Sequence, residues 1–314
     1  MKLLLNFILS VCLFIYGLQL FSNSLGNIQL KVKKILEKYT NSLKKGIILG
    51  TIITSIIQSS SIITAISVGL VNSNVITFHS SIGIMMGANL GTCFTSWLTS
   101  FLSIESTNNS LLFNPNTYTP ILIFIGLILY FKNHKRLSNL FIGYSLFLFG
   151  LNLMQTTLSP IMEYKFFKEF ISCLNSPLLG LIIGIVTTSL VQSSSATIAI
   201  LQTISNKQKL TYYMTIPIIL GENIGSCMTT LISSIGTNKN AKKTALSHLF
   251  YNIIGSIIFI ILFYLFNYLK LKFLNYQVNS YSIALIHTIF NFISIIIFYP
   301  FLNIFEKFIN IIAK

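Results

Sequence analysis

The tetrapeptide Gln-Ser-Ser-Ser occurs twice in this chain, at 58–61 and at 192–195, each time inside a long stretch that is otherwise apolar and uncharged. Hydroxyl and amide groups are costly to bury in lipid, so we expect them there only where they have a role. The same spacing of 134 residues maps 87–95 onto 221–229. The chain therefore contains a duplicated unit with a polar motif in each half, a sequence pattern that points to a transporter binding site.

Composition places the chain in a membrane. Hydrophobic residues make up 53% of it, charged residues 9%, and the mean hydropathy is +0.77. The segments 46–103 and 178–206 contain no Lys, Arg, Asp or Glu. A soluble domain could not bury that much apolar surface. The net charge of +15 comes from clusters between apolar spans, as in cytoplasmic loops, which argues against nucleic acid as a partner.

The order of apolar and basic segments predicts the topology. Apolar spans run at about 3–24, 46–72, 75–103, 118–131, 138–158, 178–204, 211–235, 244–268 and 281–304. Basic clusters follow the first, fourth and seventh spans, and 104–117 has no Lys or Arg. All three clusters lie inside, with 104–117 outside, only if 46–72 and 178–204 enter the membrane and turn back. The two halves then have opposite orientations.

This topology predicts an all-α, multi-pass membrane protein of the inner (cytoplasmic) membrane, built as an inverted repeat of transmembrane helices with two re-entrant broken-helix hairpins. A weaker similarity, offset by 133, maps 13–18 onto 146–151 and extends the repeat to the first span. We expect the first repeat over 1–137, the second over 138–243, and C-terminal transmembrane helices over 244–314. The sequence leaves a homodimer open.

Each serine triplet is expected to break its helix, because serine competes for backbone hydrogen bonds in a helix interior. A restarted helix offers free N–H groups and a positive dipole end to an oxyanion. Nearby hydroxyl and amide oxygens suit a small, hard cation. By helical spacing, one face carries Thr54, Gln58 and Ser61, and the matching face carries Thr188, Gln192 and Ser195. The alternative is helix–helix association through Ser and Thr, but two copies at a fixed offset favour a binding site.

The second repeated motif reads Gly-x-Asn-x-Gly-(Thr/Ser), with Asn89 and Asn223 as its polar residues. It predicts a second helix break in each half, although its glycines also permit close helix packing. Glu222 is the only acidic residue within an apolar span, which makes it a functional candidate. It could hold a cation or a proton, or lie at the end of the span and do neither. Its counterpart in the first half is Ala88.

Two histidines, His248 and His287, each stand in an Ala-x-x-His-x-x-x-Asn pattern. Histidine and asparagine share a helical face at this spacing. We expect a contact between these two helices rather than a metal site, because no third ligand is apparent.

Together these motifs resemble the type II sodium/phosphate cotransporter family, over nearly the whole chain. The resemblance implies symport of inorganic phosphate with sodium ions through a site between inverted repeats. The family's motif positions fall here on Gln58, Ser59, Ser60, Ser61, Gln192, Ser193, Ser194 and Ser195, with Thr54, Asn89, Thr92, Thr188, Asn223 and Ser226 as companions. Glu222 departs from the uncharged residue that the family pattern leads us to expect.

In this interpretation the coupling ion is sodium, bound through Gln58, Gln192, Thr54 and Thr188. Many bacterial family members carry a C-terminal domain resembling a phosphate-uptake regulator, and we expect this chain, whose sequence ends at Lys314 soon after its last apolar span, to lack one. The chain has no nucleophile–base constellation and no phosphate-binding Gly-Lys loop, so we do not expect an enzyme. Two alternatives stay open: another small anion or net phosphate export on the same fold, and a non-transporting membrane scaffold.

Overall fold

The structure is a computed structural model that describes residues 2–24, 28–40, 42–105, 115–161, 163–207 and 210–313. These residues are largely helical, with one isolated antiparallel bridge between Thr211 and Gln277. The helices are α1 (Lys2–Ser24), α2 (Ile28–Tyr39), α3 (Leu43–Ile57), α4 (Ser60–Asn72), α5 (Phe78–Glu105), α6 (Pro115–Phe131), α7 (Lys135–Ile161), α8 (Lys165–Cys173), α9 (Pro177–Val191), α10 (Ser194–Lys207), α11 (Tyr212–Gly225), α12 (Cys227–Ser233), α13 (Lys239–Tyr268), α14 (Ser280–Phe298) and α15 (Leu302–Ile312), with 3-10 turns η1 (Lys272–Asn275) and η2 (Tyr299–Phe301).

The chain is a multi-pass membrane protein. Five stretches of the described helices are long and apolar enough to cross a bilayer, and a bent pair, α8 with α9, would make a sixth. Large apolar side chains on these and other helices face outward, as lipid-facing side chains do: Phe124, Ile261 and Ile296 are all more than half exposed. The predicted spans 46–72 and 178–204 are each divided into two shorter helices, α3–α4 and α9–α10.

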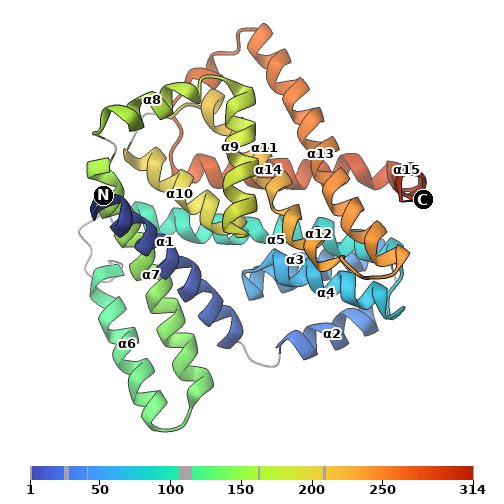
Figure 1. Cartoon of the computed structure of the whole chain (residues 1–314), viewed down its shortest axis with the longest axis horizontal. Helices are drawn as coiled ribbons and strands as arrows, with labels where there is room; N and C mark the ends of the chain where they lie inside the picture. Colours follow the sequence, from blue (N-terminus) through green and yellow to red (C-terminus); the bar gives the residue numbers. More distant parts are fainter. Residues whose placement is uncertain are drawn as a thin grey trace.

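Helices α1 and α7, which are the same element of the two halves, lie directly against each other (Figure 1). A side chain at Gly17 would clash with the backbone at Phe147, and one at Gly150 with the backbone at Phe14. Gly150 is the counterpart of Gly17 at the offset of 133, and Phe147 is the counterpart of Phe14. The two contacts are therefore equivalent when the halves are exchanged. The rings of Phe14 and Phe147, themselves equivalent positions, lie 5.0 Å apart. Glycine at 17 and 150 thus permits the close approach of the two helices.

A second close helix pair occurs once in each half, α3 with α5 and α9 with α11. Gly50 of α3 lies against the carbonyl oxygen of Ile84, and its counterpart Gly184 of α9 lies against that of Ile218. Small residues four apart on both partners let the backbones touch, as in small-xxx-small packing of membrane helices. The two pairs are related by the sequence offset of 134, so the repeated glycines have one physical reason in both halves.

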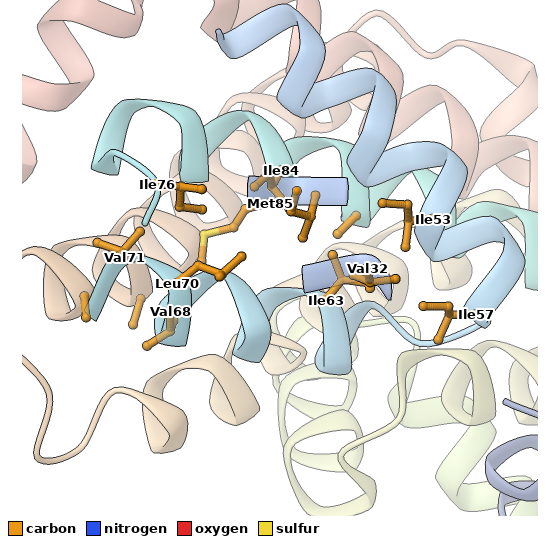
Figure 2. Packing of buried hydrophobic residues seen from close by; sticks show 14 residues of the cluster. Val32, Ile53, Ile57, Ile63, Val68, Leu70, Val71, Ile76, Ile84 and Met85 are labelled. Atoms are coloured by element: carbon orange, nitrogen blue, oxygen red, sulfur yellow. The ribbon is translucent and has the colours of Figure 1, made fainter. Parts of the chain in front are cut away.

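The core beside the first pair is a cluster of branched and sulfur-containing side chains from α2, α3, α4 and α5, shown in Figure 2. Ile53, Ile63 and Ile84 come from three different helices, and Ala241 and Ala245 bring α13 against the same cluster. Helices α13 and α14 contact both α5 and α11. They therefore join the two halves, and they also contact α4 and α10, the helices that begin at the serine triplets.

Candidate functional site

Both serine triplets break their helices, as the sequence predicts. Helix α3 ends at Ile57, Gln58 has left-handed backbone angles (φ 61°, ψ 25°), and Ser59 caps α4. In the second half α9 ends at Val191 and Gln192 has nearly the same conformation (φ 52°, ψ 26°). The left-handed region is unfavourable for a residue other than glycine, and such strain concentrates at functional sites.

The first serine of each triplet holds the start of the second helix. The N–H of Ile62 donates to Ser59 Oγ at 3.4 Å, and the N–H of Ala196 donates to Ser193 Oγ at 3.3 Å. Serine is a preferred residue at this capping position because its oxygen accepts from an otherwise unpaired N–H. The remaining free N–H groups of α4 and α10 lie in the first turn, at the following serines.

The two breaks meet at one cavity of about 360 Å³. Its walls combine both Gln-Ser-Ser-Ser segments with residues of α1 and α12: Ile15, Leu18, Gln19, Asn23, Gln58, Ser59, Ser60, Ser61, Ile62, Val191, Gln192, Ser193, Ser194, Ser195 and Thr229. No lysine, arginine, histidine or carboxylate is among these lining residues. Two helix N-termini, one from each half, begin at this wall. The cavity therefore offers hydroxyl groups and positive dipole ends, which suit a small anion.

Three polar lining residues were not predicted from the sequence. Gln19 and Asn23 come from α1, and Thr229 comes from α12. Gln19 and Asn23 are spaced i, i+4 in an apolar span, a signal that could have drawn attention to that helix face. Thr95, the counterpart of Thr229, donates from Oγ1 to Gln58 Oε1 at 2.7 Å and so fixes the side chain at the first break.

The other predicted site residues do not line this cavity. Thr92 donates to the carbonyl oxygen of Ala88 (3.0 Å) and Ser226 to that of Asn223 (2.7 Å). Thr188 donates to Thr197 Oγ1 at 3.0 Å. The hydroxyl of Thr54, by contrast, is buried and has no hydrogen-bond partner in the described structure.

The predicted second break is wrong in the first half. Helix α5 runs without interruption from Phe78 to Glu105, because Gly87 and Gly91 pack against backbone oxygens of α3 instead of unwinding. In the second half Ser226 alone separates α11 from α12, but its backbone angles are helical (φ −62°, ψ −22°) and 212–233 form one candidate span, so the chain does not unwind there either. Gly221 and Gly225 still pack against α9 there. The motif thus serves close packing in both halves.

The two histidine helices contact each other as predicted, for example through the rings of Phe259 and Phe290, which lie 4.9 Å apart, but the hydrogen-bonding partners of both histidines lie on other helices. His248 Nδ1 lies 2.9 Å from Thr230 Oγ1, and its Nε2 lies 3.0 Å from Asn89 Oδ1. His287 Nδ1 lies 2.9 Å from Ser96 Oγ. Ser96 and Thr230 are equivalent positions, because they are 134 residues apart. The two histidines therefore contact equivalent hydroxyl groups, His287 in the first half and His248 in the second. A group of three His, Cys, Asp or Glu side chains that could hold a metal ion is absent from the described residues.

The partner of His287 Nε2 is Glu222, whose Oε2 lies 3.6 Å away. Both side chains are 1% exposed, so the carboxylate lies in the interior and not at the end of its span. Asn223 Nδ2 donates to Glu222 Oε2 at 3.0 Å, and the Ser194 hydroxyl lies near the carboxylate. Ser194 lines the cavity. Glu222 itself does not line the cavity, and Ser194 lies between its carboxylate and the cavity.

A duplicated, helical membrane protein with a polar cavity lined by residues of both halves has the architecture of a class of small-solute transporters. Comparison with known proteins gives the family: residues 13–156 and 146–295 each match the model of the Na+/Pi-cotransporter family. The chain belongs to this family. The first match runs from α1 into α7, and the second runs from α7 into α14.

The individual relatives share a quarter or less of their residues with this chain over most of its length, and more only over a short segment. YqeW of Bacillus subtilis (strain 168) is 25% identical over 99% of both chains. The "Putative inorganic phosphate export protein YjbB" of Escherichia coli (strain K12) is 22% identical over 82% of this chain, which spans 46% of YjbB. The "Sodium-dependent phosphate transport protein 2B" of Homo sapiens is 42% identical over 74 residues, 24% of this chain and 11% of that one. No solved structure matches.

Proposed function

We propose that this chain is a secondary transporter that moves inorganic phosphate through the cavity between the two serine triplets, coupled to sodium ions. One observation carries the proposal: two helix N-termini, from α4 and α10, begin at the wall of a single cavity lined by both triplets. Phosphate has the oxygens and negative charge that such N-termini bind. Family membership and the names of the relatives support the same substrate.

Sodium supplies the positive charge that the cavity wall lacks. Phosphate carries negative charge, and a negative cell interior opposes its entry by roughly 2.3 kcal/mol per charge per 100 mV. Cations that bind with it offset this cost and couple uptake to their own gradient. The buried hydroxyl of Thr54, which has no hydrogen-bond partner in the described structure, is the strongest candidate ligand. Gln58, Gln192 and Thr188 are the other candidate sodium ligands.

We propose further that the two halves form an inverted repeat and that α3–α4 and α9–α10 are re-entrant hairpins of the cytoplasmic membrane. The contacts between α1 and α7, which recur when the halves are exchanged, support a symmetry axis between these helices. In this arrangement, movement of one half against the other opens the cavity to each side in turn. The alternative function on the same fold is phosphate export. The similarity to YjbB over 82% of the chain supports this alternative.

The test is flux of radiolabelled phosphate in proteoliposomes that contain the purified full chain, with sodium replaced by choline at fixed pH and membrane potential. Sodium-coupled symport predicts concentrative movement only with a sodium gradient, and reversal of the flux when the gradient is reversed. Uphill movement that persists in choline would contradict sodium coupling. Absence of phosphate flux under all gradients would contradict phosphate transport itself.

A further inference from the structure

The carboxylate of Glu222 is isolated from water and only partly paired. Its side chain is 1% exposed, Oε2 accepts from Asn223, and Oε1 is buried with no hydrogen-bond partner in the described structure. The one basic side chain that the described residues place within ion-pair distance is His287, itself 1% exposed. An ionised carboxylate in such a setting requires a compensating positive charge.

We infer that Glu222 and His287 together hold one proton, next to the cavity between the serine triplets. Glu222 Oε2 and His287 Nε2 are 3.6 Å apart, close enough for a proton to be held by either atom after a small movement. The pair is then either a carboxylic acid beside a neutral imidazole or a carboxylate beside an imidazolium. The two forms contain the same number of protons and leave no unbalanced charge in the membrane interior.

The donors around the carboxylate favour a proton over a metal ion. A hard cation needs an oxygen cage of about six ligands. Here Oε2 instead faces two nitrogens, the amide Nδ2 of Asn223 and the imidazole Nε2 of His287. An N–H group pointing at the carboxylate repels a cation, whereas an imidazole nitrogen can give or take a proton.

The titratable groups that face Glu222 are few. Among the described residues they are His287 of α14, Cys93 of α5 and Cys227 of α12, and α10 contributes the hydroxyl of Ser194 near it. The equivalent place in the first half has Ala88 in place of the acid. There His248 Nε2 lies against the neutral amide of Asn89. The chain therefore contains its own control: two equivalent histidines, of which only one faces a carboxylate.

Ser194 connects this proton to the cavity. Its hydroxyl lies near the carboxylate, within reach of a hydrogen bond after a small movement, and the same residue begins α10 at the cavity wall. A protonated Glu222 can donate to Ser194 Oγ and free the hydroxyl hydrogen to donate into the cavity, whereas an ionised Glu222 draws that hydrogen toward itself. Proton occupancy should thus alter phosphate binding. This link rests on the proposed function, but the proton site does not.

Infrared spectroscopy of the purified full chain, with the histidine rings isotopically labelled, tests the proton site directly. Near neutral pH the wild type should show one protonated carboxyl or one imidazolium signal that Glu222→Gln removes and His248→Gln retains. Glu222→Asp, which keeps the acid, should move the signal without removing it and serves if Glu222→Gln does not fold. An ionised carboxylate beside a neutral imidazole in the wild type would overturn the inference.

The pH dependence of phosphate flux in proteoliposomes tests the link to the cavity. Phosphate itself titrates near neutral pH, so the readout is the ratio of each variant's flux to the wild-type flux at each pH. This ratio should vary with pH for Glu222→Gln and stay constant for His248→Gln. A constant ratio for Glu222→Gln would overturn the link. Absence of flux in the wild type, with the infrared signal present, would contradict the proposed function and leave the proton site standing.

Discussion

A negative charge placed at the cavity wall should abolish phosphate transport without disturbing the fold. Ser60 is the first residue of α4 and lines the cavity. In Ser60→Asp the new carboxylate stands at a helix N-terminus, where acidic side chains stabilise the helix. Ser60→Asn is the matched control, because it has nearly the same size and no charge. Any difference between the two variants therefore reports the charge.

The size of the cavity determines how strongly the new carboxylate of Ser60→Asp repels phosphate. A sphere of about 360 Å³ has a radius of about 4.4 Å, and two like charges about 4 Å apart repel by about 4 kcal/mol at an effective dielectric constant of 20. Since 1.4 kcal/mol is a factor of ten, this is about a thousandfold loss of affinity, whereas full screening by water would leave about 1 kcal/mol, or about fivefold. We expect this loss for Ser60→Asp relative to Ser60→Asn.

The assay is equilibrium binding of radiolabelled phosphate to the purified variants, followed by flux in proteoliposomes. Thermal unfolding of both variants verifies that they are folded. Equal phosphate affinity in Ser60→Asp and Ser60→Asn would refute the reasoning, because a charge on the wall of an anion site cannot be neutral. The second triplet allows the same comparison with Ser194→Asn and Ser194→Asp, although the new charge there also lies near Glu222.

The remaining predictions concern space and packing. Ser60→Leu and Ser194→Leu should each abolish phosphate flux while the protein inserts and folds, because leucine fills the cavity; normal flux in both would assign the triplets to helix association. Gly221→Ala should destabilise the protein by about 1–3 kcal/mol, since its new methyl group meets the backbone of α9. Gly69→Ala, in open space on α4, should be neutral or stabilising by up to about 1 kcal/mol, and equal midpoints of thermal unfolding in the two variants would contradict the packing account.

The helix breaks could be predicted because serine and glutamine act locally. A run of serines weakens a helix interior and favours a cap, whatever surrounds it. The glycine motif is different, because glycine permits both unwound backbone and close packing. Which of the two occurs depends on whether another helix lies within reach. Gly87 has α3 against it, and that neighbour is a tertiary fact that one sequence does not contain.

The partners of the two histidines could not be predicted from the sequence for the same reason. The spacing of His287 and Asn291 correctly places both on one helix face, but helical periodicity says nothing about the helix that faces them. The structure brings Ser96 and Glu222 to His287 from different halves. Asn23 was missed for a related reason, because a polar residue near the end of a span resembles an ordinary helix end until the cavity is seen.

The central claim is that the two serine triplets form one phosphate site, and a structure of the full chain with phosphate and sodium tests it most directly. We predict density for phosphate between the N-termini of α4 and α10, in contact with hydroxyl or N–H groups of both triplets. Phosphate bound at one triplet alone, or outside the cavity that they share, would contradict the claim.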